Sequence, residues 1–362
     1  MMASPTLINL ARSTLTAFIS SHIDIGILAC HPTTMRLLDQ VHQACITKDY
    51  SPQTERAYCQ WIERFLRFHR SQTGIWVHPH AMTSKHVESF LTHLAVNRHV
   101  ASSAQNQALN AIVFLFRDVV KKEIGEFDAV RAKRPKRLPT VLSQVEVRRV
   151  LAAMESGSIH GLMAHLLYGS GLRLMECCTL RVMDVDLDRG QIVVRAGKDN
   201  KDRVTMLPIS LRNLLSAQIE RVTRRHASDL HRGRGWVQVP DSVKHKRPSA
   251  PKELGWQFLF PSSRCVKDLD TGRWQRWYVH PSMLSRAVKR ATTDAGLAKR
   301  VTCHTFRHSF ATHLLEAGYD IRTVQELLGH KDVQTTMIYT HVMQQPGVGV
   351  ISPLDADGFP VA

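Results

Sequence analysis

The sequence predicts a mostly α-helical protein with two domains, a helical one over residues 35–130 and a mixed one over residues 141–342. Its 362 residues are enough to bury two sizeable cores. In the first part, apolar side chains recur at helical intervals, and no strand-like alternation appears. In the second part, two short runs at residues 192–194 and 203–207 are typical of strands, which predicts a small antiparallel sheet between helices.

Residues 1–34 precede the first predicted domain and are interpreted as an extension. Arg12, His22 and Asp24 interrupt its apolar residues, so we expect neither a signal peptide nor a membrane-spanning run, which needs roughly 20 apolar residues. We expect this extension to be disordered or loosely attached, or to result from a start codon assigned before Met35.

The helical domain is predicted from three amphipathic stretches. The first, at residues 51–74, has Ser51 as a capping residue, Pro52 at the first helical position and Glu55 near the positive end of the helix dipole. Two further helices are expected to begin near residues 83–84 and to run over residues 103–120.

The charge of the chain indicates a polyanionic partner, most often a nucleic acid. The formal net charge is +17, and residues 221–300 alone hold 18 Lys and Arg against 6 Asp and Glu. A merely basic soluble protein is the alternative.

The 7 cysteines are odd in number and form no C-x-x-C pair. This pattern argues against a disulfide framework and against a Cys-rich zinc site, and it favours a reducing cytoplasm.

Residues 131–140 are the predicted linker, because Pro135 and Pro139 break helices and the charged side chains keep the segment solvated. Two interpretations stay open: a plain solvated linker, or a segment that lies along nucleic-acid phosphates. Its basic residues are Arg131, Lys133, Arg134, Lys136 and Arg137.

The mixed domain is expected to open with a helix that Ser143 caps, with Glu146 three residues on. A helical stretch leads to Gly171-Leu172-Arg173, and the two short strands follow. Residues 343–362 form a C-terminal tail.

The most informative stretch is residues 303–342, which places His304, Arg307, His330 and Tyr339 close together in the sequence, with Arg173 far upstream. Arginine presents a permanently charged fork to the nonbridging oxygens of a phosphodiester. His304 and Arg307 are three residues apart, so they share one face of a helix.

Each of these residues also has a plain structural interpretation. A lone tyrosine is usually core or surface, and Arg173 alone is an ordinary surface charge. His304, His308 and His313 have roughly helical spacing, but no acidic or cysteine ligand completes a standard zinc set, so we interpret His308 and His313 as packing residues.

Four motifs in this order, G-L-R-L-x-E, H-T-F-R-H, L-L-G-H and I-Y-T-H, resemble those of the tyrosine recombinases, or phage-integrase-type recombinases. The resemblance covers roughly residues 36–342. It implies a helical, SAM-like core-binding domain followed by an α+β catalytic domain that needs neither metal nor ATP. Its implied catalytic residues are Arg173, Lys198, His304, Arg307, His330 and Tyr339.

The resemblance also implies a role for each residue. Tyr339 is the nucleophile that forms a 3′-phosphotyrosine, and Arg173 and Arg307 stabilise the charged transition state. His304 acts in proton transfer with the tyrosine, and His330 hydrogen-bonds the phosphate. Lys198, or as second choice Lys201, protonates the leaving 5′-oxygen, although Asp199 stands where the family usually has glycine. Glu176 is expected to orient Arg173, and a plain surface glutamate is the alternative.

The chain is longer than a Xer recombinase between the hairpin and His304, and this insertion, residues 226–282, resembles that of the integron integrases. Its motifs are H-x-x-D-L-x-x-G-x-G, V-x-V-P, K-x-K-x-P and W-Q-x-x-F-P-S, and the tail G-V-G-V-I-S-P-L-D is similar too. The subfamily recombines attI duplexes with attC sites folded as single-strand hairpins, and it works as a tetramer on two sites. Aromatic side chains that stack on protruding bases contribute roughly 1–3 kcal/mol per base.

The insertion departs from the subfamily at two places. Trp277-Tyr278 stands where many integron integrases have His-His, and Arg247 replaces an aromatic residue in K-x-K-x-P. We interpret Trp256 as core and Trp277 and Tyr278 as exposed stacking candidates. The expected DNA-binding residues, besides the linker, are Lys201, Trp236, Lys244, Lys246, Arg247, Arg276, Trp277 and Tyr278. The alternatives are a Xer-type or phage-type recombinase acting on duplexes, and a catalytically silent DNA-binding protein.

Overall fold

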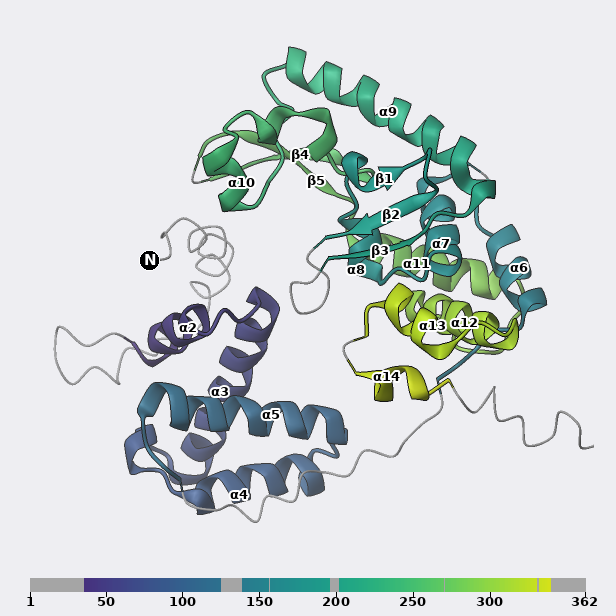
Figure 1. Ribbon diagram of the computed structural model, residues 1–362. Helices are drawn as coiled ribbons and strands as arrows, with labels where there is room; N and C mark the ends of the chain where they lie inside the picture. Colours follow the sequence, from purple (N-terminus) through teal and green to yellow (C-terminus); the bar gives the residue numbers. More distant parts are fainter. Residues whose placement is uncertain are drawn as a thin grey trace, which may run out of the picture. The chain divides into compact units, whose positions relative to one another are not determined.

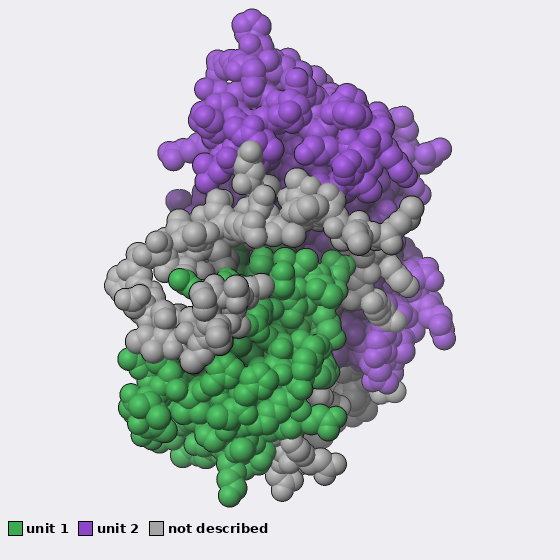
Figure 2. All heavy atoms as spheres, turned by 90° about the vertical axis from the view of Figure 1, so that its left-hand side faces the viewer, with its two compact units in different colours: residues 1–137 green, residues 138–362 purple. Residues whose placement is uncertain are grey.

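The computed structural model describes residues 36–124, 139–155, 157–195, 202–269, 271–330 and 332–339. The chain divides into two compact units, Met1–Arg137 and Leu138–Ala362 (Figure 2). The basic run at residues 131–137, and both Lys198 and Lys201, lie outside the described residues. None of the described helices is long and apolar enough to cross a membrane.

Unit 1 is helical throughout its described part, as the sequence predicts (Figure 1). Ser51 accepts a hydrogen bond from the Thr54 amide, Pro52 begins the helix, and Gly74 ends it in the left-handed conformation. The predicted cap is therefore confirmed. Its α-helices within the described residues are α2 (Leu37–Thr47), α3 (Pro52–Thr73), α4 (Ser84–Thr92) and α5 (Ser102–Phe114).

The core of unit 1 is built from aromatic side chains on α3, α4 and α5. Phe65 packs edge-on against Phe90 and Phe116, with ring centroids 5.4 and 6.2 Å apart. Both α4 and α5 continue into π-helical turns, at His93–Asn97 and Leu115–Val120. The second turn places Leu115, Phe116 and Val120 in the core, so it extends the buried face of α5.

Unit 2 mixes helices with two small antiparallel sheets, which confirms the predicted mostly α class (Figure 1). Ser143 and Glu146 form the predicted reciprocal cap at the start of the first helix. The helices are α6 (Gln144–Ala152), α7 (Ile159–Gly169), α8 (Leu174–Cys178), α9 (Arg212–His231), α10 (Asp241–Lys246), α11 (Pro281–Asp294), α12 (Cys303–Glu316), α13 (Ile321–Leu328) and α14 (Val333–Met337).

The first sheet contains the two predicted strands and one short addition. Strand β2 (Gln191–Val194) lies between β1 (Val185–Asp186) and β3 (Arg203–Met206). Val194 pairs with Arg203, so the end of β2 lies next to the start of β3. That segment contains both candidate lysines.

A second sheet, inside the insertion, was not expected from the sequence. Strand β4 (Pro261–Lys267) pairs with β5 (Trp274–Tyr278), and the register shifts between Pro261 and Cys265. An initial proline and an irregular register hide the alternation that identifies a strand. Trp256 is 8% exposed and packs in a satellite core, which confirms its predicted place.

The structure predicts that Gly171 cannot be replaced without loss of stability. Its φ is +61°, and a Cβ there would lie 2.5 Å from the buried Phe310 ring. Gly318, in the same unit, has a φ of +87° but open space around it. We expect Gly318→Ala to cost ~1 kcal/mol of unfolding free energy from backbone strain alone. Gly171→Ala should cost about 1–3 kcal/mol more, because Phe310 must move. Urea denaturation of the full chain measures both, and equal losses would contradict the predicted clash.

Candidate active site

Five of the six candidate catalytic residues belong to segments that meet in unit 2. Arg173 precedes α8, His304 and Arg307 lie on α12, and His330 and Tyr339 follow α13 and α14. Figure 1 shows α12 and α13 packed beside each other, with α14 next to α13. Lys198 is outside the described residues, so its position relative to the others stays a prediction.

Glu176 lies at the centre of the arginines. Its carboxylate accepts hydrogen bonds from the Arg173 amide and Nη1, at 2.8 and 2.7 Å. Arg203 donates to both carboxylate oxygens, from Nη1 at 2.8 Å and Nη2 at 2.6 Å. Nη1 of Arg307 is 3.9 Å away. Burial on its own would raise the pKa of Glu176, but the bonds and charge of Arg203 and Arg173 outweigh it and lower the pKa to about 2.

Arg203 was not among the residues predicted for the site, although the sequence pattern of β3 indicates that its side chain is buried. Alternation along β3 places Arg203 on the same face as Thr205 and Leu207, which are both buried. The Arg203 side chain is 9% exposed, so its charge needs a partner inside the protein. Its Nε donates to the Leu327 carbonyl at 3.0 Å, which ties β3 to α13.

The arginines also bind the C-terminal end of α13, where helix carbonyls lack partners within the helix. Arg307 donates from Nη2 to the Leu328 carbonyl at 2.5 Å, and Arg173 donates from Nη2 to the Gly329 carbonyl at 3.2 Å. Cations are favourable at this end of the helix dipole. The end of α13 therefore fixes the guanidiniums in place and holds His330 next to them.

Arg307 and His330 are in direct contact. Nη2 of Arg307 lies 3.2 Å from Nε2 of His330. Because a guanidinium can only donate, Nε2 accepts, and the proton of the neutral ring is on Nδ1, 2.9 Å from Thr336 Oγ1. Burial, followed by the charges of Arg307 and Arg173, lowers the pKa of His330 to about 3. Burial and the charge of Arg173 lower the pKa of Arg307 to about 9, so its guanidinium is still charged at neutral pH.

Tyr339 is 1% exposed, and its hydroxyl contacts His308 rather than His304. Nδ1 of His308 lies 2.7 Å from the Tyr339 Oη. His304 is exposed, and its ring neighbours that of His308 with centroids 5.6 Å apart. The packing interpretation of His308 and His313 was therefore incomplete, since His313 also makes specific bonds, to the Tyr168 hydroxyl and the Leu142 carbonyl.

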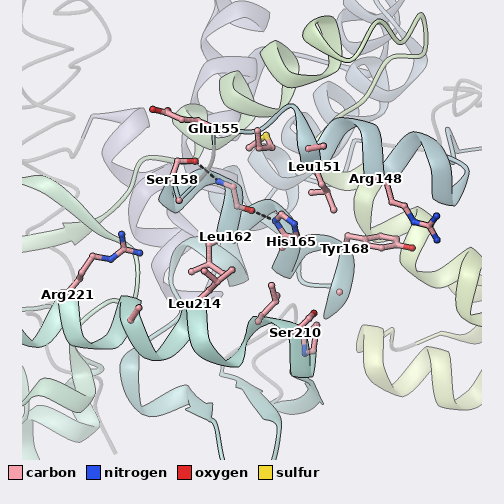
Figure 3. Close-up of a pocket in the computed structure, with 18 of the residues that line it drawn as sticks. Arg148, Leu151, Glu155, Ser158, Leu162, His165, Tyr168, Ser210, Leu214 and Arg221 are labelled. Atoms are coloured by element: carbon pink, nitrogen blue, oxygen red, sulfur yellow. Dashed lines mark hydrogen bonds between the residues drawn. The ribbon is translucent and has the colours of Figure 1, made fainter.

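A cavity of about 970 Å³ lies between α6, α7 and α9 (Figure 3). Figure 3 shows Leu151, Leu162 and Leu214 directed into it, with Arg148 and Arg221 near its edges. None of the candidate catalytic residues that the structure describes lines it. The candidate site is instead a cluster of side chains at the junction of several segments.

The insertion places its candidate DNA-binding residues unevenly. Lys244, Lys246 and Arg247 are exposed, and Arg247 pairs with Glu253 at 2.9 Å. Trp236 is half-buried, with Lys252 Nζ 4.6 Å and the Arg273 guanidinium 4.0 Å from its ring centroid.

Trp277 and Tyr278 were expected to be exposed, but both are half-buried. Tyr278 is half-buried and packs edge-on against Phe258, with centroids 5.2 Å apart, because β5 turns it toward the core. Arg276 donates to both carboxylate oxygens of Asp229, at 2.6 and 2.8 Å, so its fork is already used within the protein. Trp277 is half-buried beside Tyr278, whereas Trp274 is 40% exposed.

Comparisons with known proteins agree with this fold. The family model described as Phage integrase family matches residues 140–345, and the model for the phage integrase N-terminal SAM-like domain matches residues 37–126. An "Integrase/recombinase" of Escherichia coli is 43% identical over 324 residues, which cover 89% of this chain and 94% of that protein. The tyrosine recombinase XerA of Thermococcus kodakarensis is 35% identical over 296 residues, 81% of this chain and 86% of that one.

Solved structures share the fold at lower identity. XerH recombinase bound to its difH substrate aligns with a TM-score of 0.58 at 19% identity, over 94% of this chain and 93% of that one. A lambda integrase dimer bound to a COC′ core site aligns with a TM-score of 0.54 at 19% identity, over 84% and 93%. From the family models and the sequence relatives it follows that the chain belongs to the phage integrase family, the tyrosine recombinases.

Proposed function

We propose that this protein is a site-specific DNA recombinase that cleaves and rejoins DNA through a 3′-phosphotyrosine intermediate. One observation supports this above the others: Arg173 and Arg307 meet at Glu176, and Arg307 contacts His330, on segments that also bring Tyr339 close. Positive charge collected next to a buried tyrosine fits a reaction in which a phosphodiester is attacked by a phenolic oxygen.

Side chains of this protein account for each bond and each proton of the proposed reaction. The Tyr339 oxygen forms a bond to phosphorus, and the bond from phosphorus to the 5′-oxygen breaks. The tyrosine proton leaves through His304, and the 5′-oxygen takes a proton from Lys198 or Lys201. Arg173 and Arg307 stabilise the charge that develops on the nonbridging oxygens. The phosphotyrosine retains the energy of the bond, so rejoining is the reverse of the same step and requires no ATP.

His330 must change its hydrogen bond when DNA binds. Its Nε2 accepts from Arg307, so this nitrogen carries no proton to offer to a phosphate. The negative charge of a bound phosphodiester favours the protonated ring and raises the pKa of His330 from its low value. His330 therefore becomes a donor to the phosphate only once the phosphate is present.

We infer that Arg203 positions both the arginines and the hairpin that carries the lysines. It is the first residue of β3, directly after the β2–β3 connection, and its guanidinium binds Glu176 and the Leu327 carbonyl. A shift of Arg203 would move the hairpin relative to Arg173 and Arg307. Its planar fork suits this bidentate contact, which a lysine cannot reproduce.

The proposed substrates are integron sites: an attI duplex and an attC hairpin, bound by a tetramer. The support is the insertion at residues 226–282 and its exposed aromatic and basic side chains. Trp274 is 40% exposed, and the Arg234 guanidinium lies 5.1 Å from its ring centroid. Such a ring offers a stacking face to an unpaired base. Trp274 is therefore the most exposed of the aromatic candidates, whereas Trp236, Trp277 and Tyr278 are half-buried and Arg276 is paired with Asp229.

A second candidate is a Xer-type recombinase that acts on duplex DNA, favoured by the 35% identity to XerA. A third is a catalytically silent DNA-binding protein of the same fold. Covalent trapping separates the three.

We expect an SDS-resistant protein–DNA adduct on a nicked attC bottom-strand hairpin, in buffer containing EDTA. The complementary top-strand hairpin, a Xer-type duplex and the Tyr339→Phe variant are the controls, because only the bottom strand presents the correct protruding bases. An adduct on the duplex but not on the hairpin would favour the Xer-type reaction. No adduct on any substrate would favour the silent DNA-binding protein.

The choice between the two lysines has its own test. We expect Lys198→Ala to slow cleavage by about 10²- to 10⁴-fold, the range of a lost general acid. A substrate with sulfur at the bridging 5′ position should restore the rate, because a thiolate leaves without protonation. Lys201→Ala is the matched control and should change cleavage of both substrates equally. A rate restored by sulfur only in Lys201→Ala would assign the acid to Lys201.

The role of Arg203 predicts that Arg203→Lys slows adduct formation by about 10- to 100-fold, since misplaced catalytic groups cost rates of that order. DNA affinity should change little. Arg189→Lys is the control, because Arg189 forms a 3.4 Å pair with Asp186 on the same sheet but is 79% exposed. Single-turnover cleavage and filter binding measure the two quantities. A wild-type rate in Arg203→Lys would contradict the proposed role.

A further inference from the structure

The Tyr339 hydroxyl is held by His308, a residue that has no part in the reaction proposed above. His308 lies on α12, directly after Arg307 and one helical turn after His304. Its Nδ1 is 2.7 Å from the Tyr339 Oη, and the two ring centroids are 5.6 Å apart. Because Tyr339 is 1% exposed, bulk water does not compete for this hydroxyl.

We propose that His308 is a positioning residue for the nucleophile: it fixes the place of the Tyr339 oxygen and the direction of its O–H bond before attack on the phosphate. The proposal rests on the proposed function. It gives His304 and His308, one turn apart on the same helix face, different tasks.

Both groups of this hydrogen bond are neutral at neutral pH. Burial, followed by the neighbouring His304 and Arg307, lowers the pKa of His308 to about 4, so the ring is neutral at neutral pH. Burial raises the pKa of Tyr339 to about 12, although Arg307 and Arg173 act in the opposite direction. The hydroxyl therefore keeps its proton, and in the tautomer that the proposal assigns, with the ring proton on Nε2, it donates that proton to Nδ1.

The packing around Tyr339 explains why this bond decides the position of the oxygen. The tyrosine belongs to an apolar cluster with Phe310, Leu315, Val324 and Leu328, which holds the ring but offers no polar partner. Among the described residues, His308 is the hydrogen-bond partner of the hydroxyl. Without it, a buried hydroxyl would be unsatisfied and would turn away to find another partner.

The arrangement also leaves the oxygen able to react. A hydroxyl that donates its proton to Nδ1 keeps its lone pairs free for phosphorus. The rings of His304, His308 and Tyr339 follow one another, with successive centroids 5.6 Å apart. A rotation of the O–H bond redirects the proton toward the His304 side, so His308 itself neither gains nor loses a proton over the step.

The first test needs no DNA. The full chain is labelled with [ζ-¹³C]tyrosine, and Tyr339→Phe identifies the Tyr339 signal among the 6 tyrosines. We expect His308→Leu to shift this signal. His308→Asn should keep it close to the wild-type position, because an amide oxygen can occupy the place of Nδ1. A Tyr339 signal that stays unmoved in His308→Leu would overturn the proposal.

The second test measures the reaction on the nicked attC bottom-strand hairpin. We expect His308→Leu to slow single-turnover adduct formation by about 10- to 100-fold with unchanged DNA affinity, and His308→Asn to recover most of the rate. His165→Leu is the matched control, since His165 bonds the Gly161 carbonyl of its own helix and has no place in the proposed reaction. A wild-type or faster rate in His308→Leu would overturn the proposal.

The two tests distinguish a failure of the proposed function from a failure of the proposed role of His308. Thermal melting of each variant shows whether it is folded, and His308→Asn keeps the inference testable if His308→Leu is not. If the wild-type protein forms no adduct on the hairpin, its top strand or the duplex, the proposed function fails. The tyrosine signal then still decides whether His308 holds the hydroxyl.

Discussion

The candidate site depends on one buried carboxylate. Glu176 is 8% exposed at its side chain and binds Arg173 and Arg203, with Arg307 3.9 Å away. Three guanidiniums at such short distances repel one another strongly, because water screens charges poorly in a buried site. The ionised carboxylate makes the cluster possible, and the arginines in turn keep it ionised by lowering its pKa to about 2. Each of the segments that carry the arginines is therefore tied to α8.

Backbone carbonyls fix two of the arginines that lie at Glu176. Arg307 donates to the Gly171 carbonyl, and Arg173 donates to the Gly329 carbonyl, so each arginine is fixed by the chain next to another site residue. Both glycines have φ near +60°, a conformation that turns the chain sharply at the place where the carbonyl is needed. The guanidiniums are thus held before any substrate arrives, which is the condition for electrostatic stabilisation of a transition state.

The sequence predicted those parts of the structure that depend on neighbouring residues. The cap at Ser51 and the reciprocal cap of Ser143 with Glu146 are local, and both are confirmed. The contact between Arg173 and Glu176 is also local, three residues along one turn. The pairs of Arg203 with Glu176 and of His308 with Tyr339 join residues 27 and 31 positions apart. Such pairs depend on tertiary packing, and so does the irregular β4–β5 pairing. Arg203 could have been found from the alternation of buried residues on β3. His308 could have been found from its position one helical turn after His304.

The charge balance explains why the histidines of the site are neutral. Three guanidiniums face one carboxylate, so the cluster keeps an excess of positive charge. This excess, added to burial, lowers the pKa of His330 to about 3 and of His308 to about 4. A neutral His308 can accept the tyrosine proton in a hydrogen bond, whereas a protonated ring could not. A bound phosphodiester would offset the excess and allow His330 to become a donor. In the proposed reaction the substrate therefore supplies the negative charge that the site lacks, and His330 can donate a hydrogen bond to the phosphate only when DNA is bound.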